Sequence, residues 1–267
     1  MCVAFWIWDD HPVYSLLLAL NRDEYLSRPT ESVHWWQDLG KILAGRDGKE
    51  GGTWMGITRN GRLAFITNFR EPETLDQAIS RGELTTRFLK GSQSPIEYLE
   101  EVASEADKYN GFNLVVADLS SRKMGYLSNR PKNADILVRE LAPGIYGLSN
   151  ALLDSMWPKV QFGKGALQRL TSKFLDGEIP ERCLLEDILK DNTRASYELL
   201  PDTGYGLDWE HKLSSICVDC DTVKGQYGTR SMNVIAVRKN GQVSFFESFI
   251  EDGVWKDHRF EFEIETC

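Results

Sequence analysis

The chain has 267 residues, 42% of them hydrophobic, and a formal net charge of −9 at pH 7. Nucleic acids and anionic membranes bind basic surfaces, so we expect neither as a partner. No apolar run is long enough to cross a bilayer, and the apolar start lacks the basic residues of a secretion signal. An odd count of five cysteines fits a reducing compartment, and we expect a cytoplasmic protein.

The first third of the chain is predicted to consist of strands. Val3–Trp8 is apolar on both faces, and Val13–Leu20 is its expected hairpin partner. The stretch Tyr25–Gly40 is predicted to be a loop. Asn60-Gly61 is typical of a hairpin turn. Strands are expected before and after it, at Ile42–Ala44, Trp54–Thr58 and Arg62–Asn68.

Two helical regions alternate with further strands. Ser94-Pro95-Ile96-Glu97 is a capping box with proline at the first helical position, which predicts a helix to about Ala106. The other expected helices are Glu83–Lys90, Val160–Leu175 and Glu181–Lys190. The remaining expected strands are Phe112–Asp118, Met124–Ser128, Asp135–Glu140, Ile145–Asn150, Leu213–Val218, Met232–Arg238, Val243–Ile250 and Trp255–Ile264, with Tyr197–Leu213 as a loop.

This order predicts the fold class. Strands, two helices, strands, two helices and strands follow one another without a linker or repeat. Strands that are apolar on both faces suit two stacked sheets with helices outside them. We therefore expect a single α+β domain over residues 1–267, arranged as a four-layer αββα sandwich.

Cys2 directly follows the initiator methionine. Removal of Met1 would leave Cys2 with a free thiol and a free α-amine, whose pKa is near ~8. Such an amine can act as the base for its own side chain, as in N-terminal-threonine nucleophiles. On position alone, the plainer interpretation is a second residue in a frayed end.

Polar residues recur where predicted strands end, and such ends commonly carry functional groups. They are Asn21–Glu24, Asn68, Asn150 and Arg230. Each has an ordinary explanation by itself, such as a surface ion pair between Arg22 and Asp23 or an asparagine in a turn. Together with the Cys2 thiol they supply the parts of an acyl-transfer site.

The expected roles follow from the chemistry of these groups. The Asp23 carboxylate would hold the ammonium of the nucleophile. The side-chain amides of Asn150 and Asn68 would donate to the oxyanion, and loss of one such donor costs ~10²–10³ in rate. The guanidinium of Arg230 or Arg22 would lower the thiol pKa.

A regular pleat constrains this picture. It would point Asn21 and Asp23 to one face of the strand and Arg22 to the other, unless a bulge intervenes. We assign Cys2, Asp23, Asn150 and Arg230 to catalysis. We assign Asn21, Arg22 and Asn68 to ligand binding.

Several stretches together resemble one family. They are Met1-Cys2 before an apolar strand, Asn21-Arg22-Asp23-Glu24, Gly52-Thr53-Trp54-Met55-Gly56, Thr67-Asn68-Phe69-Arg70, Tyr146-Gly147-Leu148-Ser149-Asn150 and Tyr227-Gly228-Thr229-Arg230-Ser231. The chain resembles the NRDE family, also called the transport and Golgi organisation family. That family is similar to the N-terminal-nucleophile hydrolases, among them cysteine acylases that cleave bile-salt amides and penicillin V.

The resemblance implies a four-layer αββα fold and a site in which Cys2 is the nucleophile, Asp23 the partner of its amine, Asn150 the oxyanion donor and Arg230 the late arginine. One feature departs from the acylases. Their early arginine precedes the aspartate by three residues, whereas Arg22 adjoins Asp23 here and Leu20 stands at the acylase position.

The family's associations with Golgi organisation, haem mobilisation and acyl-CoA or lipid metabolism leave open a scaffold in Golgi organisation that works through its surface, which no sequence feature marks, and two functions of the cleft. One is an amide or thioester hydrolase that requires no cofactor. The other is a non-catalytic carrier of haem, lipid or acyl-CoA in the same cleft, associated with the Golgi or mitochondria. Both take a small-molecule or lipid-like ligand.

We expect no metal site. Cys217 and Cys220 have the spacing of half a zinc site, but no second pair accompanies them. The four histidines are scattered along the chain.

Overall fold

The computed structural model describes residues 2–37, 40–132, 136, 138–175 and 177–265. The chain forms two compact units. The first unit comprises Met1–Arg28 and Pro143–Phe262, and the second comprises Pro29–Ala142 and Glu263–Cys267. The single domain expected over residues 1–267 stays a prediction.

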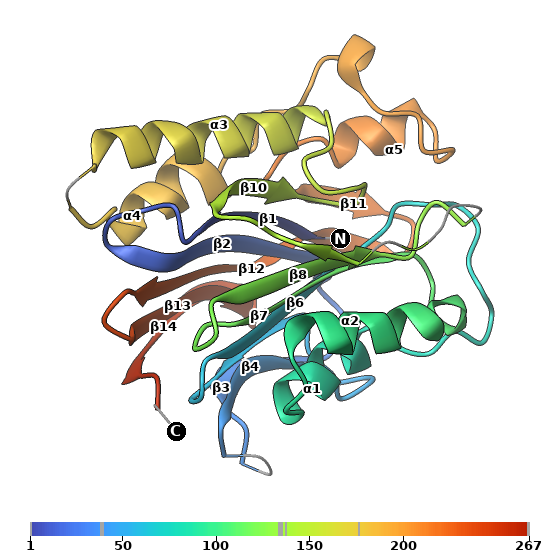
Figure 1. Ribbon diagram of the computed structural model, residues 1–267. Coiled ribbons are helices and arrows are strands. Elements are labelled where there is room, and N and C mark those ends of the chain that lie inside the picture. Colours follow the sequence, from blue (N-terminus) through green and yellow to red (C-terminus); the bar gives the residue numbers. More distant parts are fainter. Residues whose placement is uncertain (1, 38–39, 133–135, 137, 176, 266–267) are drawn as a thin grey trace. The chain divides into compact units, whose positions relative to one another are not determined.

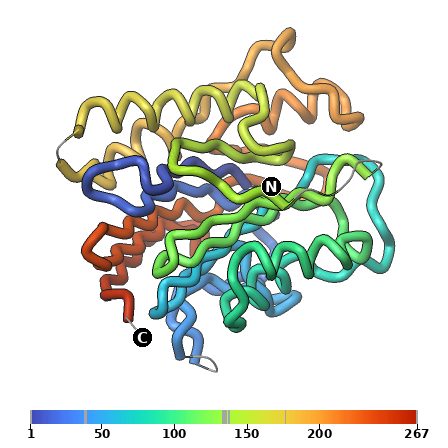
Figure 2. The backbone as a smooth tube through the Cα atoms, viewed as in Figure 1, coloured from blue at the N-terminus to red at the C-terminus, as the bar shows by residue number. Residues whose placement is uncertain are grey.

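The first unit contains a seven-stranded antiparallel sheet in the order β10-β1-β2-β12-β13-β14, with β11 also paired to β12 (Figure 1). Its strands are β1 (Cys2–Trp8), β2 (Tyr14–Tyr25), β10 (Gly144–Leu148), β11 (Asp219–Thr222), β12 (Gly225–Arg238), β13 (Gln242–Glu251) and β14 (Val254–Glu263). Figure 2 shows the blue amino-terminal strands between β10 and the red carboxy-terminal strands. The strand that starts at Cys2 is therefore an interior strand.

Helices cover one face of this sheet. They are α3 (Pro158–Lys173), α4 (Glu181–Leu184), the π-helical turn Leu185–Leu189 and α5 (Leu207–Lys212), with a 3₁₀ turn at Tyr197–Leu199. Val3 and Phe5 of β1 pack with Leu167 of α3 and with Ile188 in one buried apolar cluster. Because strand side chains alternate, Cys2 lies on the opposite face of the sheet.

The second unit contains an antiparallel sheet in the order β3-β4-β5-β6-β7-β8-β9. Its strands are β3 (Thr30–Trp35), β4 (Ile42–Asp47), β5 (Met55–Thr58), β6 (Arg62–Asn68), β7 (Phe112–Asp118), β8 (Lys123–Ser128) and β9 (Arg139–Glu140). Helices α1 (Gly82–Lys90) and α2 (Pro95–Ser104) pack on it through Phe88, Leu99 and Val102, and a 3₁₀ turn follows at Ala106–Lys108. The capping box at Ser94 is present as predicted.

Most predicted elements are confirmed, and the errors have physical causes. β2 continues through Asn21–Glu24 because both β1 and β12 pair with that segment. The predicted loop Tyr25–Gly40 is wrong, because the edge strand β3 forms there. The predicted strand Leu213–Val218 is also wrong: its apolar side chains are buried without a strand ladder, and β11 begins at Asp219. Helix α5 was missed inside the predicted loop Tyr197–Leu213. Part of the predicted strand Asp135–Glu140 lies outside the described residues.

The expected fold class is confirmed at the level of its layers. Each unit is one antiparallel sheet with helices packed on it, so two helical layers and two sheets are present. Among the described residues, no helix is both long and apolar enough to cross a membrane.

Candidate functional site

Cys2 lies in a structured and buried position. It is the first residue of β1, its exposed fraction is 8%, and it pairs in register with Arg22 of β2. The interpretation of Cys2 as part of a frayed end is therefore wrong. Burial raises the pKa of the Cys2 thiol, and the negative charge of Asp23 raises it further. The positive charge of the amino terminus acts in the opposite direction, followed by the Arg22 charge and a hydrogen bond from the Asp23 backbone.

Ser149 and Asn150 follow β10, the other neighbour of β1, and both are fully buried. The Ser149 hydroxyl lies 3.2 Å from the Cys2 carbonyl oxygen and 3.2 Å from Oδ1 of Asn150, and it is the donor in both contacts. The carboxamide oxygen of Asn150 accepts from Ser149, and the amide nitrogen is the donor end of the same side chain. This is the end that an oxyanion requires.

Asp23 is 2% exposed, and hydrogen bonds from β12 fix its orientation. Its Oδ1 accepts a hydrogen bond from the Thr229 hydroxyl at 2.7 Å, and its carbonyl accepts one from the Tyr227 hydroxyl at 3.2 Å. The Thr229 oxygen also accepts the Val218 backbone N–H at 2.9 Å. A bulge between Thr229 and Ser231 interrupts the register of β12 against β2 at this point.

The two arginines differ in their surroundings. Arg22 is 5% exposed, and its charge acts directly on the thiol. Arg230 is half-buried in the bulge, where its Nη1 donates to the carbonyl oxygens of Tyr25 at 3.0 Å and Arg28 at 2.6 Å. The structure thus brings Arg22 to Cys2 and uses Arg230 to hold the end of β2, and the catalytic assignment of Arg230 stays a prediction.

The asparagines assigned to ligand binding lie elsewhere. Asn21 is fully buried on the helical side of the sheet, where its amide nitrogen donates to the carbonyls of Leu189 at 2.8 Å and Ile216 at 3.2 Å. Asn68 is half-buried at the end of β6 in the second unit, opposite Phe112 of β7. Their roles in ligand binding stay predictions.

Several polar residues of the first unit were not singled out from the sequence. Ser149 and Thr229 adjoin predicted site residues, and their hydroxyls could have been suspected for that reason. Asn233 and Glu247 are 0% and 1% exposed and face each other on β12 and β13, in the face of the sheet that contains Cys2. A glutamate inside the aromatic stretch of β13 was the available signal.

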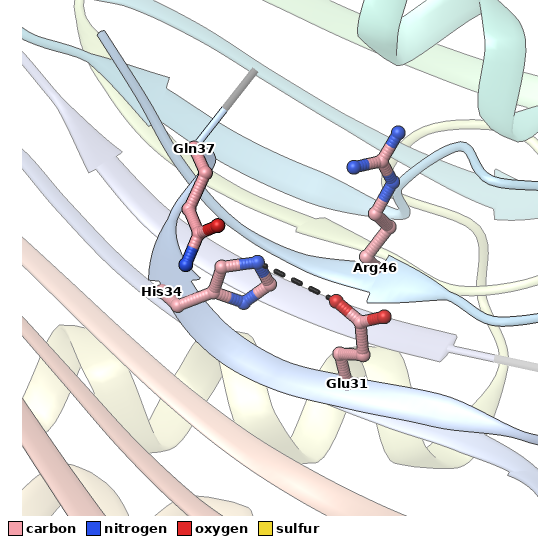
Figure 3. A pocket seen from close by; sticks show the side chains of 4 residues that line it. All are labelled: Glu31, His34, Gln37 and Arg46. Carbon is pink, nitrogen blue, oxygen red and sulfur yellow. Dashed lines mark ion pairs between the residues drawn. The ribbon is translucent and has the colours of Figure 1, made fainter. Parts of the chain in front are cut away.

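A polar hollow of about 520 Å³ lies on the second unit and is lined by Glu31, His34, Gln37 and Arg46 (Figure 3). His34 Nε2 is 3.5 Å from Oε2 of Glu31, and its Nδ1 is 2.8 Å from the Ser32 carbonyl oxygen. A bulge in β3 between Glu31 and His34 puts these two side chains together. The hollow contains none of the predicted site residues. No group of three or more metal-ligating side chains occurs in the described ranges.

The comparisons with known proteins agree with the fold and the motifs. The model of the family "Transport and Golgi organisation 2" matches residues 1–252. The chain is 38% identical to the human Transport and Golgi organization protein 2 homolog over 285 residues and 36% identical to the mouse homolog over 283, with all of each chain covered. The Drosophila melanogaster protein of that name is 28% identical over 289 residues.

Solved structures of conjugated bile acid hydrolase from Clostridium perfringens share the fold. Two variants match with TM-scores of 0.52 and 0.53, at 9% and 10% sequence identity, over 99% of this chain and 97% of theirs. This likeness shows the fold alone, and it confirms the predicted fold class. The family model and the full-length relatives establish that the chain belongs to the transport and Golgi organisation 2 family.

Proposed function

We propose that the protein is a thiol hydrolase in which Cys2, after removal of Met1, attacks the carbonyl carbon of an amide or thioester. The observation that carries this proposal is the environment of one thiol. Arg22 pairs with Cys2 in register, and the Asp23 backbone N–H donates a hydrogen bond to the Cys2 thiol. The hydroxyl of Ser149, the residue before Asn150, donates to the Cys2 carbonyl oxygen. Solved structures that share this fold include a protein named as a conjugated bile acid hydrolase.

The proposed reaction has two steps, acylation of the thiol and hydrolysis of the thioester. The sulfur of Cys2 forms a bond to the acyl carbon, and the bond from that carbon to the nitrogen or sulfur of the leaving group breaks. The leaving group takes the proton that the α-amine removed from the thiol. Water then hydrolyses the thioester, which releases a carboxylic acid and restores the thiol. No cofactor is required.

Each neighbouring group has one role in these steps. The Asp23 carboxylate holds the ammonium that forms on Cys2, and the Asn150 amide nitrogen donates to the oxyanion. Arg22 favours the thiolate. Arg230, retained from the sequence motif, keeps the end of β2 in place through its bonds to backbone carbonyls.

The elevated pKa of the thiol explains why a base is needed. Burial keeps the Cys2 thiol protonated at neutral pH, and a protonated thiol is a poor nucleophile. An α-amine on the same residue could remove the proton without another side chain. The proposal therefore depends on the loss of Met1.

The same pKa also favours the second candidate, a carrier of haem, lipid or acyl-CoA that acts at the Golgi or mitochondria. A buried, protonated thiol is compatible with a site that no longer reacts. The adjacency of Arg22 and Asp23, in place of the three-residue spacing of the acylases, points the same way.

Intact mass and acyl-probe labelling test the proposal. We expect purified protein to lack Met1 and to form an acyl adduct on Cys2 with a p-nitrophenyl ester. Cys2→Ala should lose the adduct, and Cys220→Ala, which removes another buried thiol of the same unit, should keep it. Retention of Met1 in protein that turns over the ester would overturn the mechanism. Absence of an adduct, together with haem or acyl-CoA binding that survives Cys2→Ala, would favour the carrier.

A further inference from the structure

A small cavity of about 130 Å³ lies on the helical side of the first unit, on the sheet face opposite to Cys2. Its walls come from the start of α3, from residues 191–195 and from residues 214–216. Phe162 and Ile216 supply apolar surface. The cavity contains none of the residues assigned to the proposed reaction.

The charges around the cavity favour an anion. Lys159 and Arg194 line it, and Asp191 is the acidic residue among the described lining residues. Lys159 is 5% exposed, and its ammonium donates to the Leu213 carbonyl at 2.9 Å. The cavity is thus net cationic on a chain whose net charge is −9. Ammonium and guanidinium groups make their strongest hydrogen bonds to anionic oxygens.

The acidic residue of the cavity already has partners in its own turn. Oδ1 of Asp191 accepts the Thr193 backbone N–H at 3.1 Å, and Oδ2 accepts the Thr193 hydroxyl at 3.1 Å. These two hydrogen bonds fix the orientation of Asp191 within its own turn.

The size of the cavity limits the ligand. A volume of 130 Å³ is roughly four times that of one water molecule in the liquid. Apolar walls and a cationic rim suit a short alkyl chain that ends in a carboxylate. We propose that this cavity binds a short-chain monocarboxylate and that the ligand controls access to the Cys2 thiol.

Two contacts lead from the cavity to the strand segments next to Cys2. Ile216, which lines the cavity, accepts a hydrogen bond from the amide of Asn21, and Asn21 pairs with Val3, the neighbour of Cys2. Two residues further along, the Val218 backbone N–H donates a hydrogen bond to the Thr229 hydroxyl. That side chain holds Asp23. A ligand against Ile216 therefore rests on the segment that supports the strand end next to Cys2.

The expected effect follows from linkage. Cys2 is 8% exposed, so a thiol reagent reaches it after local opening of the strand end. A ligand that binds the closed state alone reduces the open population by a factor of 1 + [L]/Kd. At ten times Kd, labelling should slow about tenfold. For a ligand of this size we expect a Kd of about 1 mM.

The regulation of thiol access by a carboxylate rests on the proposed function, because hydrolysis of an amide or thioester releases a carboxylate. Binding and thiol access can nevertheless be measured without turnover. If no amide or thioester is cleaved, the hydrolase proposal fails while the binding site stands.

The experiment titrates the full chain with butyrate, butylamine and butyramide and records the Tm and the rate of Cys2 alkylation. Arg194→Met removes an exposed cation of the cavity, and Arg182→Met removes an exposed cation of α4 as its control. Ala195→Leu fills the cavity and tests the site without removing a charge. The Tm of each variant without ligand shows that it is folded.

We expect a saturable rise in Tm and slower alkylation with butyrate alone. Arg194→Met and Ala195→Leu should weaken butyrate binding at least tenfold, and Arg182→Met should leave it unchanged. An equal effect of butylamine, or full butyrate binding in both cavity variants, would overturn the site. Butyrate binding with an unchanged rate of Cys2 alkylation would overturn the proposal that the ligand controls access to the Cys2 thiol.

Discussion

The Thr229 hydroxyl donates a hydrogen bond of 2.7 Å to Oδ1 of Asp23, across 206 residues of sequence. The two residues pair directly between β12 and β2, at the edge of the bulge that contains Arg230. The hydroxyl oxygen also accepts the Val218 backbone N–H. One buried hydroxyl therefore joins the carboxylate assigned to the Cys2 amine to the segment that runs from residue 216 to β11.

Thr229→Val should destabilise the protein and impair the site. Valine has a similar shape but leaves the Asp23 oxygen and the Val218 amide without the hydroxyl. Each buried polar group that loses its partner costs about 1–3 kcal/mol. We expect a decrease of about 2 kcal/mol or more in the free energy of unfolding, measured by urea denaturation. Thr229→Ser keeps the hydroxyl and is the control; equal losses in both variants would contradict the role of the hydrogen bond.

The alkylation rate of Cys2 should depend on pH in a way that reports its burial. The thiolate is the reactive form, so the rate rises with pH and levels off above the pKa. An unfolded cysteine has a pKa of ~8.5, so its rate levels off above that pH. Because burial raises the pKa of Cys2, the rate in the folded protein should still rise where the rate in the denatured chain has levelled off.

The charge of Arg22 provides a check on the same measurement. Arg22→Gln removes a positive charge that lowers the Cys2 pKa, so it should shift the profile to still higher pH. Arg169→Gln, an exposed change on α3, is the control. Identical profiles for the folded and denatured chains would contradict the effect of burial.

Replacement of two glycines of α3 by alanine should change the stability of the protein in opposite directions. A Cβ at Gly163 would lie 2.1 Å from the Phe5 ring of β1, so Gly163→Ala should cost about 1–3 kcal/mol through overpacking. A Cβ at Gly165 would meet only the end of the Arg169 side chain, at 3.5 Å. There the higher helix propensity of alanine should add up to about 1 kcal/mol. Thermal unfolding of both variants measures this, and destabilisation by both would contradict the packing argument.

The ion pair between Glu71 and Arg130 should stabilise the second unit at neutral pH, and acid should abolish this contribution. Burial alone would raise the Glu71 pKa, but hydrogen bonds from Arg130 and the Gly111 backbone outweigh it and lower the pKa. Arg130 Nε and Nη2 each lie 2.5 Å from the carboxylate. The lowered pKa means that the contribution is present above the unfolded pKa of ~4.3 and is lost as pH falls through the folded value.

Glu71→Gln tests this dependence. At pH 7 it should lower the free energy of unfolding by about 2 kcal/mol, as expected for hydrogen bonds to a charged group. The difference from the unmodified protein should shrink as the pH falls to about 3. Glu73→Gln, on an exposed carboxylate nearby, is the control. A difference that stays constant with pH would contradict the assignment.

Local patterns were sufficient for much of the fold. The Asn60-Gly61 turn, the capping box at Ser94 and the doubly apolar stretch Val3–Trp8 depend on residues a few positions apart, and all three are present. The prediction failed where the stabilising partner was remote. β2 extends through Asn21–Glu24 because β12, some 200 residues later, pairs with it. The edge strand β3 lacks a clear apolar alternation, so its sequence resembled a loop.

The sequence by itself determined which chemical groups the protein has: a cysteine at position 2, polar residues at strand ends and the motifs of its family. Only the tertiary structure decided what each group contacts. It buries the Cys2 thiol beside Arg22, binds Asp23 to Thr229, uses Asn21 to hold the helical layer and turns Arg230 toward backbone carbonyls. The physical reason is that periodicity and turn propensity are local. Strand order and the bulge at Arg230 arise from pairing between distant segments, and these set the direction of each side chain.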